Sequence, residues 1–427
     1  MIRDINTMVL DDGLELHHIH TDKFKTDMFG VYFKRPLTDR EATMNSLLAR
    51  MLKRGTKTYD TAQKLNVKLD DLYGSIIASS CDKYGEKHVL QIKIQFPNRD
   101  RIKDENITKE AWALLMDVVY NQLQEGDGFK AEYFEQEKYF LKQDILARIN
   151  DKASYASDRM IEEMYEGEAF SVNVDGDIET LEKITSEELW DHYLELMRMS
   201  EIDFCFIGNV PVNEILVTVM EKESMFAELR LGQFLLPDED FSIIDREVKN
   251  IEEPMDVNQG KLVMGFRTAV NKNNDLYESL MLGSVILGGG TDSKFFKNIR
   301  EKESLCYYGY SYVDKFKGLL GMSFGIDFDK FDKTKELALM HLEEMKNGEF
   351  TEENIENARK KVVNSLRATG DFPNSFMNFF YNQILSRGNF DFEAMLKRIY
   401  MVNKETIVRA FENVTLDTVY FLKGKEE

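Results

Sequence analysis

The chain has 427 residues, of which 43% are hydrophobic and 31% are charged. It is therefore long enough for two or more domains, and its composition excludes a disordered protein. The net charge of −21 argues against a surface that binds nucleic-acid phosphates. This acidity is explained by solubility alone, and an acidic cavity that attracts basic peptides is the alternative.

The N-terminus has no apolar leader, and no apolar run is long enough to cross a bilayer, so we expect a cytoplasmic protein without membrane contacts. The three cysteines, Cys81, Cys205 and Cys306, are scattered along the chain. Such an arrangement argues against a disulfide framework and against a zinc site built from thiolates.

Two strands open the chain. Residues 14–20 alternate between apolar and polar side chains, and residues 29–33 are predicted to be the hairpin partner. His18 and His20 share a face of the first strand, but no acidic residue of the same segment alternates onto that face. We therefore expect packed or solvated histidines there. An independent metalloenzyme built on His17, His18 and His20 remains an alternative.

The next predicted element is an amphipathic helix over residues 39–54, which ends at Gly55. Its apolar residues follow helical spacing: Met44, Leu47, Leu48, Met51 and Leu52. Further helices and strands are expected downstream, with helices at 61–72, 109–124 and 130–150 and strands at 75–80 and 88–96. The helix at 130–150 carries Glu137 and Asp144, which lie two turns apart on one face.

The two ends of the chain repeat the same order of elements. A helix starting near Thr185 and a strand ending at Gly208 precede residue 225, and a helix near Asn403 and a strand ending at Gly424 close the chain. The offsets are nearly constant, since 424 − 208 = 216 and 403 − 185 = 218. This pattern predicts an internal duplication with the α+β fold class, in which two homologous domains each have a mixed, mainly antiparallel sheet with helices packed on one side.

The predicted domains are residues 1–225 and residues 251–427, joined by an acidic, turn-rich linker at 226–250. The second domain opens with a strand at 260–267 and a helix at 276–287. Three glycines and a helix at 292–301 follow. A hairpin is then expected from strands 305–314 and 319–328, and helices at 332–346, 352–369 and 374–386 fill the remainder.

The glycines Gly288, Gly289 and Gly290 precede the most specific motif of the sequence. The chain continues as Phe-Phe-x-x-Ile-Arg-Glu-Lys, and then as Leu-Cys-Tyr, which places Arg300 and Tyr307 around one helix-to-strand corner. This motif resembles the second-domain signature of the pitrilysin/insulinase family of zinc peptidases, the inverzincins. The resemblance implies that Arg300, Tyr307 and the three glycines bind the substrate, because the family grips the peptide backbone here, opposite its zinc.

The same resemblance places the family's zinc motif, H-x-x-E-H, on the helix at 39–54. The matching positions are Ser46, Ala49 and Arg50, and the later of the family's two glutamates corresponds to Asp144. Ser46 is a weak ligand, Ala49 cannot act as a base and the cation of Arg50 repels zinc. We therefore expect a degenerate zinc motif, no metal or other cofactor on this chain, and no catalytic residue on this chain alone.

The family includes chains of this length that pair, one with the zinc motif and one without it. The resemblance thus implies the non-catalytic subunit of a heterodimeric zinc peptidase, in which a homologous partner holds zinc and both subunits enclose the peptide. The isolated chain is expected to be able to homodimerise. The alternative is a scaffold or chaperone-like subunit without a role in proteolysis. The segments at 23–26 and 72–74 are similar to a Gram-positive subgroup associated with modification of elongation factor P.

Overall fold

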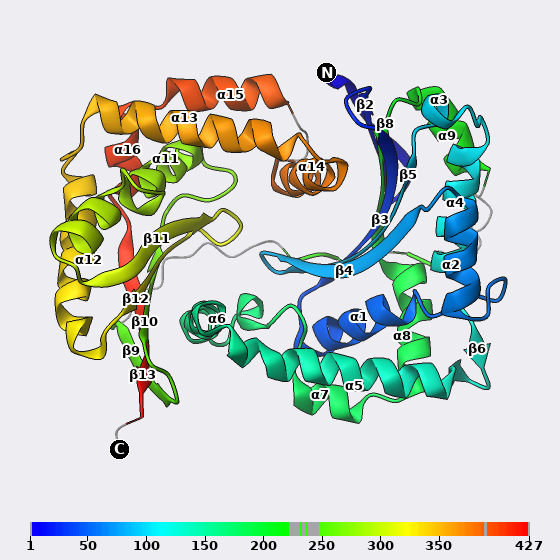
Figure 1. The fold of residues 1–427 in the computed structure, drawn as a ribbon, viewed down its shortest axis with the longest axis horizontal. Helices are drawn as coiled ribbons and strands as arrows, with labels where there is room; N and C mark the ends of the chain where they lie inside the picture. The colour runs from blue at the N-terminus through cyan, green and yellow to red at the C-terminus, as the bar shows by residue number, and fades with distance from the viewer. Residues whose placement is uncertain (1, 222–230, 233–234, 238–246, 388–390, 426–427) are drawn as a thin grey trace. The chain divides into compact units, whose positions relative to one another are not determined.

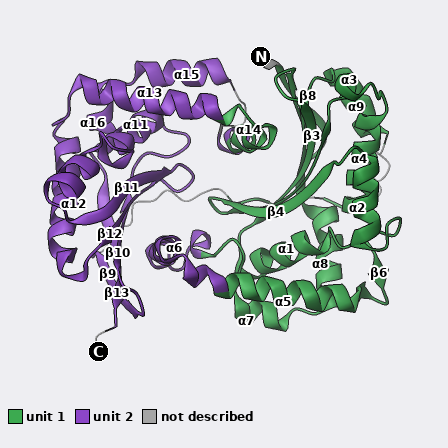
Figure 2. Ribbon diagram, in the orientation of Figure 1, with its two compact units in different colours: residues 1–146, 172–238, 369–382 green, residues 147–171, 239–368, 383–427 purple. Residues whose placement is uncertain are grey.

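The computed structural model describes residues 2–221, 231–232, 235–237, 247–387 and 391–425. The chain forms two compact units (Figures 1 and 2). Unit 1 consists of Met1–Leu146, Val172–Asp238 and Thr369–Asn382, and unit 2 consists of Ala147–Ser171, Glu239–Ala368 and Gln383–Glu427. No helix in the described part of the chain has both the length and the apolar composition that a membrane span requires.

Unit 1 contains a six-stranded sheet in the order β1-β2-β8-β3-β5-β4. Its strands are β1 (Ile2–Asp11), β2 (Leu14–Thr21), β3 (Thr26–Pro36), β4 (Ile76–Tyr84), β5 (Lys87–Pro97) and β8 (Glu201–Gly208). The predicted hairpin between residues 14–20 and 29–33 is wrong, because β8 lies between β2 and β3, parallel to β2 and antiparallel to β3. Strand β8, which is remote in sequence, thus pairs with β2 where the sequence pattern predicted β3.

Most helices of unit 1 pack on one face of this sheet. Alternate residues of β3, namely Phe29, Val31 and Phe33, are fully buried in the main core, where the apolar faces of the helices meet them. The helices and short strands are α1 (Asp39–Met51), α2 (Ala62–Asp71), α3 (Arg99–Ile102), α4 (Ile107–Tyr120), β6 (Gln124–Glu125), β7 (Gly128–Phe129), α5 (Ala131–Ala147), α7 (Ile178–Lys183), α8 (Ser186–Met199) and α9 (Val212–Met220). After α5, the short helix η1 (Arg148–Asn150) already belongs to unit 2.

The opposite face of the first sheet carries polar side chains and is covered by the first part of α14 (Pro373–Arg387). The rings of Tyr32 on β3 and Tyr381 on α14 stack with their centroids 3.8 Å apart. Lys93 on β5 donates to Asn374 at 3.2 Å and also to Asn378. Residues 369–382 therefore belong to unit 1 although they follow most of the second half in sequence.

Unit 2 contains a five-stranded sheet in the order β11-β12-β10-β13-β9. Its strands are β9 (Lys249–Met255), β10 (Gly260–Arg267), β11 (Cys306–Asp314), β12 (Leu319–Ile326) and β13 (Thr415–Gly424). Its helices are α6 (Lys152–Met164), η2 (Ala169–Ser171), α11 (Tyr277–Gly288), η3 (Phe295–Lys302), η4 (Phe328–Lys330), α12 (Phe331–Lys346), α13 (Glu352–Thr369), α15 (Phe392–Met401) and α16 (Lys404–Phe411).

Helix α6 follows α5 in sequence but packs on the sheet of unit 2. Met160 and Met164 are fully buried in one cluster with Val263 on β10 and Tyr420 on β13. Gly265 makes room for them, because a Cβ at that position would lie 2.4 Å from the sulfur of Met160. The units thus exchange two segments, residues 147–171 and 369–382, relative to contiguous halves divided at 225 and 251.

The two sheets share one topology. Reading from β4 and from β11, the orders β4-β5-β3-β8-β2 and β11-β12-β10-β13-β9 match strand for strand, each with three antiparallel pairings and one parallel pairing. The predicted α+β fold with mixed, mainly antiparallel sheets is confirmed. The predicted linker at 226–250 lies largely outside the described residues, and β9 begins at its end.

Candidate functional site

Helix α1 carries the positions that the sequence aligns with a zinc motif. Thr38 caps the helix, with its hydroxyl accepting from the backbone N–H of Glu41 at 3.1 Å. Ser46 and Ala49 are 5% and 4% exposed, and the Ser46 hydroxyl donates to the carbonyl of Val174 at 3.1 Å. The motif positions therefore lie against the protein, and their side chains offer neither an imidazole nor a carboxylate to a metal.

Arg50 lies on α1 opposite the two carboxylates of α5. Its guanidinium pairs with Asp144, and its Nη1 lies 3.7 Å from Oε2 of Glu137. Glu137 also accepts from Arg54, one turn further along the chain. A fixed cation thus contacts both carboxylates that the resemblance equates with the acidic residues of a zinc site, which is the position where a metal would need them free.

Cys81 on β4 lies next to this helix and contacts the Ser46 hydroxyl, and desolvation raises the pKa of its thiol far above the ordinary value. This partly buried thiol is a small apolar side chain rather than a reactive thiolate. The arrangement of Ser46, Ala49, Arg50 and Cys81 can stabilise the helix but supplies no group that activates water.

The second candidate site is the corner around η3 and β11 in unit 2. Tyr307 is 58% exposed, and its hydroxyl donates to Oδ1 of Asp327 at 2.8 Å. This hydrogen bond raises the pKa of Tyr307, while the ammonium of Lys330 and the same hydrogen bond lower the pKa of Asp327. Tyr307 therefore stays protonated at neutral pH, and its single hydroxyl proton is donated to Asp327.

Arg300 lies in η3, a segment with the wide spacing of a π-helix. Its guanidinium carbon lies 4.7 Å from the centre of the Phe296 ring, a cation–π contact, and the residue is exposed. Phe295 and Ile299 are fully buried and anchor the helix. The segment starts at Phe295, so the predicted start of this helix at residue 292 is wrong.

The three glycines serve close packing. A Cβ on Gly288 would lie 2.4 Å from the backbone nitrogen of Ser311 on β11, and one on Gly289 would lie 2.6 Å from the Cα of Val285. Gly290 has φ of +141°, a conformation that side chains disfavour. Their packing fixes the corner that carries Arg300 and Tyr307, and their predicted contact with substrate remains a prediction.

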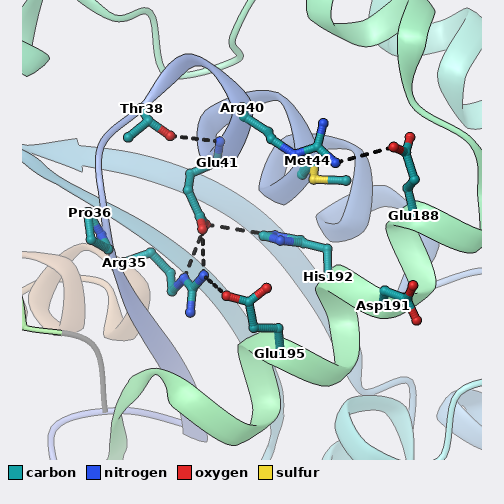
Figure 3. Close-up of a pocket in the computed structure, with 10 residues that line it drawn as sticks. All are labelled: Arg35, Pro36, Thr38, Arg40, Glu41, Met44, Glu188, Asp191, His192 and Glu195. Carbon is teal, nitrogen blue, oxygen red and sulfur yellow. Dashed lines mark hydrogen bonds and ion pairs between the residues drawn. The ribbon is translucent and has the colours of Figure 1, made fainter.

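A pocket that the sequence did not reveal lies between α1 and α8 (Figure 3). Its volume is about 420 Å³, and most of its charged side chains are joined in ion pairs. Arg35 contacts Glu41 with Nε at 3.1 Å and Glu195 with Nη2 at 3.1 Å, and Arg40 lies 3.5 Å from Glu188. Strand β3 and helix α8 are remote in sequence, so only the fold brings these residues together.

The histidines of β2 divide between the two faces of the sheet. His18 and His20 contact the carbonyls of Val210 at 2.8 Å and Asn209 at 3.1 Å, as expected for packed histidines. His17 points to the other face, where it lies with Glu15 and Asp203. Sequence reasoning missed this cluster because Asp203 lies on a strand that was not expected to pair with β2.

Comparison with known proteins agrees with this description. A family model described as the peptidase M16 inactive domain matches residues 183–362. The chain is 34% identical to the "Probable inactive metalloprotease YmfF" of Bacillus subtilis (strain 168), over 97% of this chain and 96% of that protein. A conserved protein from Enterococcus faecalis V583 has the same fold, with a TM-score of 0.91 and 24% identity over all of both chains.

A third match, a peptidase M16 inactive domain from Pseudomonas fluorescens, has a TM-score of 0.77 and 14% identity over 99% of each chain. The fold and the comparisons together define a homologue of metallopeptidases. The chain belongs to the M16 peptidase family, as an inactive member. The resemblance to the pitrilysin-like zinc peptidases is confirmed, and the family membership is consistent with a non-catalytic role.

Proposed function

We propose that this chain is the non-catalytic subunit of a two-subunit zinc peptidase. The observation that carries the proposal is the ion pair of Arg50 with Asp144, together with the approach of Arg50 to Glu137. Because a guanidinium contacts these carboxylates and Ala49 stands at the base position, zinc and the water-activating base have to come from another chain. That chain is a homologous subunit with an intact H-x-x-E-H motif.

Arg300 and Tyr307 would be this subunit's contribution to the reaction. The forked donors of a guanidinium suit a peptide carbonyl, and a protonated phenol can donate to the oxyanion that develops during hydrolysis. The exposure of both side chains supports these roles. Because the Tyr307 hydroxyl donates its proton to Asp327, this hydrogen bond would have to open when the phenol donates to the oxyanion. The glycines, by packing α11 against β11, would hold both residues at one corner.

Further parts of the proposal concern the setting of the subunit. The matching strand orders of the two sheets support an internal duplication within the chain. Two subunits that share this fold would then enclose a peptide between them. We place the complex in the cytoplasm, without nucleic acid or membrane as partner, and we expect the isolated chain to be able to homodimerise. We also propose an association with elongation factor P modification, which rests on the similarity of residues 23–26 and 72–74 to a Gram-positive subgroup.

A scaffold or chaperone-like subunit is the second candidate. It is favoured by the internal contacts of both side chains: Tyr307 donates to Asp327, and Arg300 lies on the ring of Phe296. Coexpression with a zinc-motif homologue encoded in the same genome separates the candidates. Peptidase activity that requires both chains supports the first, whereas a stable complex whose activity equals that of the zinc chain alone supports the scaffold.

A further inference from the structure

Three side chains of unit 1 gather on the polar face of the first sheet, away from the degenerate zinc helix. Glu15 and His17 lie on β2, and Asp203 lies on the neighbouring parallel strand β8, directly beside Glu15 in register. One ligand atom from each lies within 4.8 Å of the others. His17 and Asp203 are 0% and 1% exposed, and Glu15 is 38% exposed, so the cluster is buried on one side and open to solvent at Glu15.

The free ring nitrogen of His17 points into this cluster. Its Nε2 is buried and makes no hydrogen bond among the described residues, whereas its Nδ1 lies 3.0 Å from Oγ1 of Thr7 on β1. If Nδ1–H donates to Thr7, Nε2 carries a lone pair directed at the two carboxylates. This is the arrangement that orients metal-binding histidines, with one nitrogen held by an outer hydrogen bond.

The distances from His17 to the carboxylates of Glu15 and Asp203 suit a small cation bound between them better than direct hydrogen bonds. Nε2 of His17 lies 3.5 Å from Oε2 of Glu15 and 3.7 Å from Oδ1 of Asp203, beyond a good hydrogen bond. Two ligands of a tetrahedral zinc ion are about 3.3 Å apart, since each bond is about 2.0 to 2.1 Å long. Small side-chain shifts would therefore place all three atoms around one ion, with a water from the open side as the fourth ligand.

The charges around the cluster leave room for a divalent cation. Lys34 on β3 lies 3.1 Å from Oδ1 and 3.0 Å from Oδ2 of Asp203 and 3.1 Å from Glu201, and the hydroxyl of Tyr381 donates to Oδ2 of Asp203 at 2.8 Å. A bound ion would have to displace Lys34 from Oδ1, leaving its contacts with Oδ2 and Glu201. Counting Glu15, Asp203 and Glu201 as −3 and Lys34 as +1 gives a local charge of −2. A neutral His17 adds nothing, so one divalent ion would balance the charge of the cluster.

We propose that Glu15, His17 and Asp203 form a binding site for a divalent transition-metal ion of the zinc class, separate from the family's zinc motif. The site would tie β2 to β8 beneath α14 and would have a structural role. It is independent of the proposed function, because neither Arg300, Tyr307 nor Arg50 takes part. It replaces the sequence-based expectation that this chain holds no metal.

Metal titration of the purified full-length chain tests the site. The metal-free chain is titrated with Zn²⁺ against a chromophoric chelator, and with Co²⁺ while visible absorption is recorded. We expect one equivalent to bind, with affinity reduced at least about tenfold in Glu15→Gln and in Thr7→Val, the loss that even outer-shell changes cause. Glu15 and Thr7 lie at the accessible edge, so both variants should fold, which far-UV circular dichroism checks.

The matched control is His20→Gln, because His20 lies on the same strand but outside the cluster. Unchanged affinity in this variant supports the site. The proposal is overturned if the wild-type chain takes up no metal beyond a chain denatured in urea, if Glu15→Gln binds as tightly as wild type, or if His20→Gln loses binding to the same extent.

Discussion

The guanidinium of Arg50 forms an ion pair with the carboxylate of Asp144, joining α1 to α5. The two residues are 94 positions apart in sequence, and the resemblance equates each with a position of the family's zinc site. A side-chain cation contacts the carboxylate at this place between the helices. Metal-dependent peptide hydrolysis uses an ion that binds and polarises water, which a guanidinium does not do.

Restoring the motif should restore zinc binding. We expect the quadruple variant Ser46→His, Ala49→Glu, Arg50→His and Asp144→Glu to bind one equivalent of zinc more than its parent, because two imidazoles and a longer carboxylate then face each other across α1 and α5. The measurement is zinc content after gel filtration, in a Glu15→Gln background that removes the separate site proposed above.

The matched control keeps Arg50 and carries the other three substitutions. Its guanidinium should still repel zinc, so no additional equivalent is expected. Equal zinc content in the control and the quadruple variant would show that Arg50 does not decide metal binding at this helix.

Local patterns were sufficient for most elements of the fold. The amphipathic helix at 39–54, the strands at 75–80, 88–96 and 260–267 and the hairpin of β11 and β12 follow from periodicity within single segments. The strands β1 and β9 and the helix α6 were not predicted. Local alternation cannot show which strand lies next to which, so the insertion of β8 between β2 and β3 was missed. The docking of α6 on β10 was missed for the same reason, since its methionine face has no partner nearby in sequence.

The candidate sites also differ in whether the local sequence indicates them. Arg50, Arg300 and Tyr307 could be named from the sequence because the resemblance assigns a position to each, and their roles stay predictions. The cluster of Glu15, His17 and Asp203 has no such signal, because β2 supplies only two of its members. The only local indication is that Glu15 and His17 lie two residues apart on one strand. Asp203 can be added only when the order of the strands in the sheet is known.

The glycine corner makes a prediction about stability. Gly288→Ala should lower the free energy of unfolding by about 1 to 3 kcal/mol, because the added Cβ meets the backbone nitrogen of Ser311 and the strand has to shift. Gly265→Ala should cost less, since its Cβ meets the flexible ends of Met160 and Met164. Urea denaturation followed by circular dichroism measures both. Equal losses, or none for Gly288→Ala, would argue against a packing role for this glycine.

A buried network predicts a pH dependence of stability. Asn45 lies 3.0 Å from Nδ1 of His88 and 2.7 Å from Nε2 of His192, and the other nitrogen of His88 contacts the carbonyl of Val174 at 2.8 Å. Burial lowers the pKa of His88 to about 4 and that of His192 to about 3. Both histidines are therefore neutral in the folded chain at pH 5, whereas the unfolded chain binds protons there.

Because the unfolded state binds more protons, stability should fall as the pH drops from about 6.5 towards 4, by up to about 1.4 kcal/mol per pH unit for each histidine. Asp27 acts in the opposite direction, since burial raises its pKa to about 6. The informative quantity is thus the difference in slope between wild type and His88→Gln, measured by urea denaturation at pH 7, 6 and 5. We expect a shallower slope in the variant and the same change in His192→Gln; parallel slopes in all three proteins would contradict this account.

The last prediction concerns the effect of Arg300 and Tyr307 on peptidase activity. In a complex reconstituted with a zinc-motif partner, Tyr307→Phe should lower kcat about 100-fold, the loss that follows removal of one oxyanion donor. Arg300→Ala should raise KM about tenfold or more, because a charged hydrogen bond to a peptide carbonyl is lost. Steady-state kinetics on a fluorogenic peptide measure both effects, and gel filtration shows whether the complex still forms.

The controls are Tyr310→Phe on the same strand and Lys297→Ala on the same helix, which are exposed neighbours without a proposed role. Both should keep wild-type kinetics. If Tyr307→Phe and Arg300→Ala also keep them while the complex assembles, the corner does not contact the reacting peptide, and the scaffold role becomes the better explanation. If all four variants lose activity together with assembly, the corner is part of the subunit interface and its assignment to the substrate is wrong.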